Sequence, residues 1–214
     1  MPRRSARRGY HHGDLRRALL NAALPLIRKG GPEALTLRAV ARAAGVSQTA
    51  PYRHFVDRAA LVAAVADEGF QRLYERLREA VTAPERATGR RRQTARAGLQ
   101  AIAVAYVQFA IDHPDEYRVM FGSEVMTTDS PPGARDQVFA FLRGGIEMLQ
   151  RQELVRDGDP GVMAVSAWAL VHGLAMLIVD RQVAGMAAPS VTELALAATD
   201  LMMFGMAKPA DGIT

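Results

Sequence analysis

Apolar residues recur every three or four positions along most of the 214-residue chain, which is the spacing of one face of an α-helix. The first such segment, residues 14–29, places Leu15, Leu19 and Leu26 on one face and stops at Gly30-Gly31. No run of alternating apolar and polar residues lies between hairpin turns. The pattern therefore predicts an all-α fold without strands.

Residues 35–54, LTLRAVARAAGVSQTAPYRH, form the most informative segment of the chain. Thr36 can cap a first short helix through its hydroxyl, and Gly45 stops that helix because glycine tolerates a positive φ. Ser47 then starts a second helix whose side chains are nearly all hydrogen-bonding groups, and Phe55 anchors its far end in the core. Two short helices joined in this way predict a helix-turn-helix whose second helix enters the DNA major groove.

The polar residues of this segment are the candidate DNA contacts. We assign Gln48 and Thr49 to base edges, and Tyr52, His54 and Arg58 mainly to phosphates. The complete set expected to bind DNA is Thr36, Arg38, Ser47, Gln48, Thr49, Tyr52, Arg53, His54 and Arg58. Pro51 removes an amide early in the second helix and can tilt its reading face. The alternative interpretation is two ordinary helices joined by a glycine turn.

Positive charge is concentrated near the predicted helix-turn-helix. The chain carries a net charge of +5, but residues 1–58 hold 12 Lys and Arg against 3 Asp and Glu. A cationic surface of this kind attracts the phosphate backbone whatever the base sequence. Residues 1–12 include four arginines among small residues, so we expect a flexible basic arm along the phosphates or in the minor groove. A merely solvated tail is the alternative.

The rest of the chain predicts a larger helical domain. Residues 82–92 break the helical periodicity and form a connector, and residues 122–133 form a mobile loop. Asp159 caps a helix that starts at Pro160, and Ser190 with Glu193 forms the capping box of the last helix. Three helices are expected between the connector and Asp159. Leu99, Ile102, Tyr106 and Phe109 mark the first, Pro114 starts a second that ends near Gly122, and Val138, Leu142, Ile146 and Leu149 mark the third.

An unusually apolar run lies between residues 164 and 179, where only Ser166 and His172 interrupt it. We expect both sides of this helix to be buried. A membrane span is the competing interpretation, but the run falls short of the roughly 18 to 20 residues of a spanning helix, and Asp180-Arg181 follow directly. Together with the last helix, this apolar surface predicts a twofold homodimer held by residues 160–208.

Composition and motifs argue against an enzyme. The chain has no cysteine, which excludes disulfides and thiol catalysis, and it contains no GxSxG, Walker, HExxH or dinucleotide-binding fingerprint. His11, His12 and Asp14 lie in the basic arm without a fourth ligand nearby, so capping and phosphate contact explain them better than a metal does. We expect no cofactor and no metal. No secretory signal is visible, which predicts a cytoplasmic location.

The segment LTLRAVARAAGVSQTAPYRHFVDRAALVAAV resembles the TetR family of bacterial transcription regulators, strongly so over residues 10–73. The resemblance implies a DNA-binding head at 13–73, with its motif at 35–54, and an effector-binding and dimerisation domain at 93–207. In this family the last two helices commonly form a four-helix bundle across a dimer. Arg58 departs from the pattern, since many relatives carry lysine there.

A narrower resemblance concerns the effector. Trp168, His172 and Gly173 lie as W-x-x-x-H-G, which is similar to the WHG-type ligand domain of some TetR regulators, and YHHGDL at residues 10–15 is similar to the same branch. Nine methionines between residues 120 and 206 suit an adaptable, mainly apolar pocket, although ordinary core packing explains them equally well. The residues expected to bind the effector are Tyr106, Phe109, Tyr117, Phe121, Phe139, Trp168, His172 and Met176.

The resulting hypothesis is a DNA-binding repressor that a small, largely apolar effector releases from its operator. A dimeric DNA-binding protein without ligand sensing and a helical enzyme are the alternatives.

Overall fold

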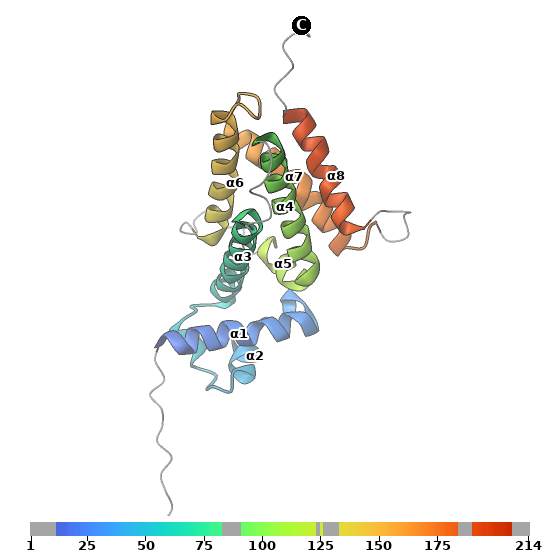
Figure 1. Ribbon diagram of the computed structural model, residues 1–214. Helices are drawn as coiled ribbons and strands as arrows, with labels where there is room; N and C mark the ends of the chain where they lie inside the picture. The colour runs from blue at the N-terminus through green and yellow to red at the C-terminus, as the bar shows by residue number, and fades with distance from the viewer. Residues whose placement is uncertain (1–11, 83–90, 123–124, 126–132, 184–189, 207–214) are drawn as a thin grey trace, which may run out of the picture. The chain divides into compact units, whose positions relative to one another are not determined.

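The computed structural model of the chain describes residues 12–82, 91–122, 125, 133–183 and 190–206, with only the backbone described at 12–14 and 91–92. Within these ranges the chain forms helices and no strand, so the all-α prediction is confirmed (Figure 1). The predicted basic arm at 1–12 and most of the predicted loop at 122–133 lie outside the described residues.

Contacts divide the chain into two compact units, which we call the head and the body. The head comprises residues 1–66 and 118–128, and the body comprises residues 67–117 and 129–214. The division falls within α3 (Arg58–Thr82), earlier than the predicted end of the head at residue 73.

The head is built from short elements that share one apolar core. They are α1 (His12–Gly30), the 3₁₀ helices η1 (Pro32–Ala34) and η2 (Pro51–Arg53), α2 (Leu37–Ala43) and the first turns of α3. Leu19 of α1, Val40 of α2 and Leu61 of α3 are fully buried in this core, and Phe55 is buried beside them. The sequence spacing therefore identified the core-facing side of α1 correctly, with Leu19 in the core and Leu15 and Leu26 packed against it.

The turn after α2 forms as predicted at Gly45, which adopts a φ of +69°. The amide of Gly45 donates to the carbonyl of Arg42 at 3.2 Å, and the amide of Val46 donates to that of Ala41 at 3.0 Å. This pair of bonds is a Schellman motif, which satisfies carbonyls that the end of a helix leaves without an intrahelical donor. Val46 then packs against the head core.

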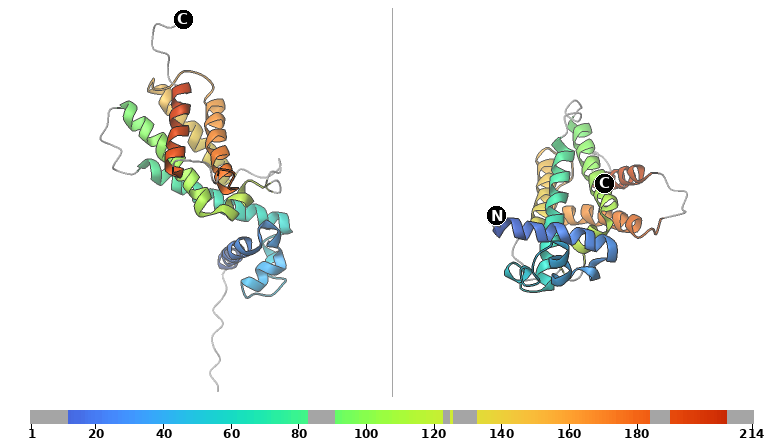
Figure 2. Two further views of the ribbon diagram at one scale, coloured as in Figure 1. Left: turned by 90° about the vertical axis from the view of Figure 1, so that its right-hand side faces the viewer. Right: turned by 90° about the horizontal axis from the view of Figure 1, so that it is seen from below.

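The body contains the rest of α3 together with α4 (Arg91–Asp112), most of α5 (Pro114–Met120), α6 (Ala134–Arg151), α7 (Pro160–Val179) and α8 (Val191–Met206). α4 packs against α7 and α8, and α7 packs also against α6 (Figures 1 and 2). The predicted caps form. Asp159 accepts a hydrogen bond from the amide of Gly161 at 2.7 Å, and the carboxylate of Glu193 accepts one from the amide of Ser190 at 2.7 Å.

α7 departs from the prediction in its burial. Val162, Val165, Leu170 and Leu177 are exposed, so the expectation that both sides of this helix are buried is wrong for a single copy of the chain. The helix is 20 residues long and is apolar enough to cross a membrane by length and composition, so the length argument against a span also fails. Its contacts with α4, α6 and α8 are those of a helix within a bundle.

Candidate DNA interface and body cavity

The segment that was expected to form the recognition helix is mostly turn. The prediction of a helix from Ser47 onward is wrong, because regular helix is confined to η2 at Pro51–Arg53. Pro51 has no amide to donate to the carbonyl of Ser47, where a first α-helical bond would form. The amide of Ala50 donates to that carbonyl instead, at 3.0 Å, and the tighter 3₁₀ pattern follows.

This reading segment, residues 47–53, presents its polar side chains to solvent. Ser47, Gln48 and Thr49 are exposed, and the hydroxyls of Ser47 and Thr49 lie 3.3 Å apart. Pro51 is buried and fixes the segment to the core, as Phe55 does just beyond it. The candidate DNA contacts that are exposed are Thr36, Arg38, Ser47, Gln48, Thr49, Tyr52 and Arg53.

Three of the candidate DNA contacts, Thr36 among the exposed set and the half-buried His54 and Arg58, have identified roles or partners within the head. The hydroxyl of Thr36 accepts a hydrogen bond from the amide of Ala39 at 3.1 Å, which confirms its role as the cap of α2. His54 is half-buried and its ring lies 6.3 Å from that of Phe55. Arg58 is also half-buried, and its guanidinium donates to backbone carbonyls of residues 32 and 35.

Four polar side chains that sequence analysis assigned to the effector meet inside the body. The hydroxyl of Tyr106 lies 3.0 Å from that of Tyr117 and 3.0 Å from Nδ1 of His172, and it accepts a hydrogen bond from Nε1 of Trp168 at 3.0 Å. The hydroxyl of Tyr117 lies 2.7 Å from the same Nδ1. We call these four residues the aromatic cluster. It joins α4, α5 and α7 at a point where the W-x-x-x-H-G spacing places Trp168 and His172 on one helical face.

Burial favours the neutral form of each ionisable group in this cluster. It raises the pKa of Tyr106 to about 12 and raises the pKa of Tyr117 further, while it lowers the pKa of His172 below its ordinary value. All three groups are therefore neutral at pH 7, and the cluster is held by neutral hydrogen bonds.

The remaining predicted effector residues do not gather around this cluster. Phe109 is buried with its ring 5.0 Å from that of His113, and Phe139 packs with the apolar residues of α6 and α7. Met176 is half-buried on α7, and Phe121 belongs to the head rather than to the body. The structure thus brings together four of the eight predicted residues.

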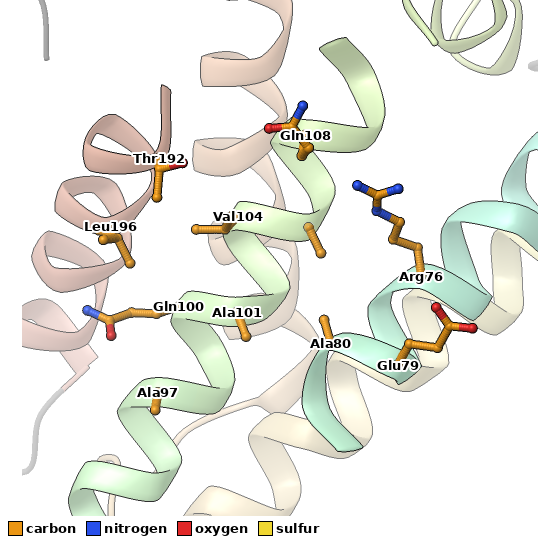
Figure 3. A pocket seen from close by; sticks show the side chains of 11 residues that line it. Arg76, Glu79, Ala80, Ala97, Gln100, Ala101, Val104, Gln108, Thr192 and Leu196 are labelled. Atoms are coloured by element: carbon orange, nitrogen blue, oxygen red, sulfur yellow. The ribbon is translucent and has the colours of Figure 1, made fainter. Parts of the chain in front are cut away.

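A cavity that sequence analysis missed lies elsewhere in the body. A groove of about 670 Å³ runs over α4 between α3 and α8, and none of the eight predicted effector residues lines it (Figure 3). Small side chains at Ala97, Ala101 and Ala105 leave this space, and their spacing of four residues is the signal that could have indicated it. Arg76 lies at one edge and pairs with Asp112 at 3.2 Å. Gln100 lies near the α8 wall.

No group of three His, Asp or Glu side chains that could hold a metal ion occurs in the described part of the chain. The side chains of His11, His12 and Asp14 lie outside it.

Comparisons with known proteins agree with this arrangement. Residues 19–65 match the family model described as bacterial regulatory proteins of the tetR family, and residues 99–202 match the one described as a tetracyclin repressor-like C-terminal domain. No curated protein sequence matches the chain.

Solved structures are similar over nearly the whole chain. A protein of unknown function from Rhodococcus sp. RHA1 is 36% identical, with a TM-score of 0.75 and coverage of 94% of this chain and 100% of that one. A TetR-family transcriptional regulator from Pectobacterium atrosepticum is 21% identical, with a TM-score of 0.68 and coverage of 94% and 100%. A fatty acid degradation regulator from Bacillus halodurans is 15% identical, with a TM-score of 0.67 and coverage of 92% and 98%.

The two family models fall on the two units that the contacts separate, and the first of them includes the cap of α2, the turn at Gly45 and the reading segment. Members of the matched family are DNA-binding regulators and not enzymes. The chain therefore belongs to the TetR family of bacterial transcription regulators.

Proposed function

We propose that the protein is a cytoplasmic, homodimeric repressor that leaves its operator when a small, largely apolar effector binds the body. The observation that carries the DNA-binding part is the exposed row of hydrogen-bonding side chains at residues 47–53, fixed by the buried Pro51 and Phe55. Flexible polar side chains on a rigid support are the arrangement that reads base edges and phosphates.

In this proposal Gln48 and Thr49 contact base edges, and Tyr52, Arg53 and His54 contact phosphates. An operator would be selected from a random-sequence duplex library with the unmodified protein. Gln48→Ala should then lower the preference for this operator over a mixed-sequence duplex by about 1 to 3 kcal/mol. An unchanged preference would remove Gln48 from the base-reading set.

The dimer rests on apolar side chains that one copy leaves uncovered on α7 and α8. Leu201 and Phe204 of α8 are 73% and 87% exposed, and Val162 of α7 is 63% exposed. A groove of about 380 Å³ lies between these two helices, so the same face offers both projecting side chains and a space to receive them. Such a face suits a twofold interface, in which each copy presents the same patch.

Light scattering tests the dimer directly. The unmodified protein should be a dimer at micromolar concentration without DNA or effector, and Leu201→Asp should produce monomer or unfold the chain, because a buried carboxylate at the twofold seam would lie near its symmetry mate. A stable monomer of the unmodified protein would contradict the dimer and leave the head assignment untouched.

The body offers two candidate sites for the effector, the aromatic cluster and the groove over α4. The aromatic cluster carries the similarity to the WHG-type ligand domain, but its four side chains already bond to one another. This mutual bonding favours the alternative of a dimeric DNA-binding protein without ligand sensing. The groove over α4 is open and has a volume within the range of small-molecule sites.

A paired set of variants separates these possibilities. Compounds from an apolar screening set that release the protein from the selected operator are titrated against its single tryptophan, Trp168. Weaker release by His172→Ala alone places the effector at the cluster, whereas weaker release by Ala101→Phe alone places it in the groove. A screen without any releasing compound supports the non-sensing alternative. An effector shifts the DNA equilibrium only if it prefers the released state.

A further inference from the structure

Arg58 directs its guanidinium at the backbone of its own unit. Its Nε donates to the carbonyl of Leu35 at 2.8 Å, and its Nη2 donates to the carbonyl of Pro32 at 3.0 Å. Nη2 also lies 3.9 Å from the carboxylate of Glu33, whose side chain is exposed. Hydrogen bonds from a charged donor are roughly twice as strong as neutral ones, so these contacts hold the side chain in one geometry.

The positive charge of Arg58 is disfavoured by its own helix and favoured by the carbonyls that it contacts. Arg58 is the first residue of α3, where the helix dipole disfavours a positive charge. The carbonyl of Leu35, the residue that caps the end of η1, accepts from Nε, and the carbonyl of Pro32, which also accepts from the amide of Leu35 at 3.1 Å, accepts from Nη2. The charge of Arg58 is thus stabilised across the head rather than along α3.

The two ends of this contact enclose the helix-turn-helix. Between Leu35 and Arg58 the chain forms α2, the turn at Gly45 and η2. Since η2 has only three residues, the reading segment has little helix of its own to hold it. We propose that Arg58 is a positioning residue that fixes the entry of the helix-turn-helix to its exit and so sets the geometry in which the reading segment meets DNA. This inference rests on the proposed DNA-binding function.

The same contacts argue against the phosphate role that the sequence suggests for Arg58. Two of its three nitrogens donate within the head, and the carboxylate of Glu33 lies beside it. Arg53, at the end of the reading segment, differs from Arg58 in its surroundings. It is exposed and makes no ion pair within the described part of the chain, so its charge is available to a phosphate. Arg53 is therefore the matched control for Arg58.

The test compares Arg58→Gln, Arg58→Lys and Arg53→Gln in the full-length protein. Affinity is measured at several salt concentrations for two probes, a mixed-sequence duplex and the operator duplex selected with the unmodified protein. A lost phosphate contact lowers the salt dependence of log K by about 0.9. Thermal unfolding of each variant gives its folded fraction, and amide hydrogen exchange over residues 35–53 reports the local order of the motif.

Positioning predicts a specific pattern. Arg58→Gln and Arg58→Lys should both lower the ratio of operator to mixed-sequence affinity by about tenfold, with the salt dependence unchanged and faster exchange over residues 35–53. Lysine should not rescue the ratio, because one ammonium group cannot replace donors at both Nε and Nη2. Arg53→Gln should instead weaken both probes alike and lower the salt dependence.

Other patterns overturn the inference. If Arg58→Gln lowers the salt dependence by about 0.9 and Arg58→Lys restores binding, Arg58 is a phosphate contact. If both affinities fall only in proportion to the folded fraction, its role is merely in stability. Failure of the unmodified protein to bind either duplex would refute the proposed function. In that case, unchanged amide hydrogen exchange over residues 35–53 in Arg58→Gln would separately refute the positioning role of Arg58.

Discussion

The head and the body differ in the exposure of their polar side chains and in the distance along the chain to the groups that hold them. In the head, the polar groups of the reading segment are exposed and are held by local backbone bonds that reach three or four residues along the chain. In the body, the aromatic cluster joins the buried Tyr106 and Tyr117 to the half-buried Trp168 and His172, and the bonded partners lie 11 to 66 residues apart. The exposed side chains of the reading segment are able to bind an external partner, whereas the side chains of the aromatic cluster already bond to one another.

Removal of the central hydroxyl of the cluster should have the largest effect on stability. Tyr106 contacts the other three members, so Tyr106→Phe should lower the free energy of unfolding by about 1 to 3 kcal/mol in urea denaturation. Tyr117→Phe should cost less, because the contacts of Tyr106 with Trp168 and His172 survive. Equal losses in the two variants would show that the cluster has no central member.

Acid should weaken the body before it affects the reading segment. Burial lowers the pKa of His172 in the folded protein, so between that pKa and its ordinary value near 6.5 the unfolded chain binds more protons. The free energy of unfolding should therefore fall as the pH drops below about 6.5. In His172→Gln this part of the pH dependence should be shallower. A profile identical in both proteins would contradict the assignment of the neutral, buried imidazole.

The two units also build the same helix-ending turn from different residues. Gly45 ends α2 in the head with a φ of +69°, while Glu153 follows α6 in the body with a φ of 57°. Gly45→Ala should destabilise the protein by about 1 kcal/mol, since a side chain is strained there. Glu153→Gly should instead stabilise it by up to about 1 kcal/mol. Thermal unfolding of both variants, each compared with the parent, measures the difference.

The smallest effect on stability is expected in the reading segment itself. Thr49→Ala should change the free energy of unfolding by less than about 0.5 kcal/mol, because its side chain is exposed. The same variant should reduce the preference for the selected operator over a mixed-sequence duplex, measured as for Gln48→Ala. A marked loss of stability would mean that its contact with the Ser47 hydroxyl supports the fold and that the contrast between the units is weaker than stated.

The sequence predicted those features that are set by hydrogen bonds between residues close together in the chain. The caps at Thr36, Asp159 and Ser190 and the turn at Gly45 each depend on bonds that reach at most five residues, and all of them form. The buried faces of α1, α4 and α6 followed from spacing in the same way, whereas the burial of α7 did not.

Its errors have different physical origins. The helix expected from Ser47 fails because Pro51 removes one local bond, and this proline was visible in the sequence but given too little weight. The exposed face of α7 depends on what covers it, which spacing within one chain does not specify. The spacing of Ala97, Ala101 and Ala105 could have indicated a groove along α4, but its walls depend on how α3 and α8 are placed beside that helix.

The triangle formed by the hydroxyls of Tyr106 and Tyr117 and Nδ1 of His172 has three short sides. With one bond for each hydrogen, either tautomer of the imidazole can fill only two of them. If Tyr117 donates to Tyr106, then either Tyr106 donates to Nδ1 or a hydrogen on Nδ1 donates to Tyr117. The two arrangements have the same number of bonds and almost the same positions of the heavy atoms. Because the triangle alone does not favour one tautomer, we expect neutron diffraction or imidazole ¹⁵N shifts to detect a mixture of the two.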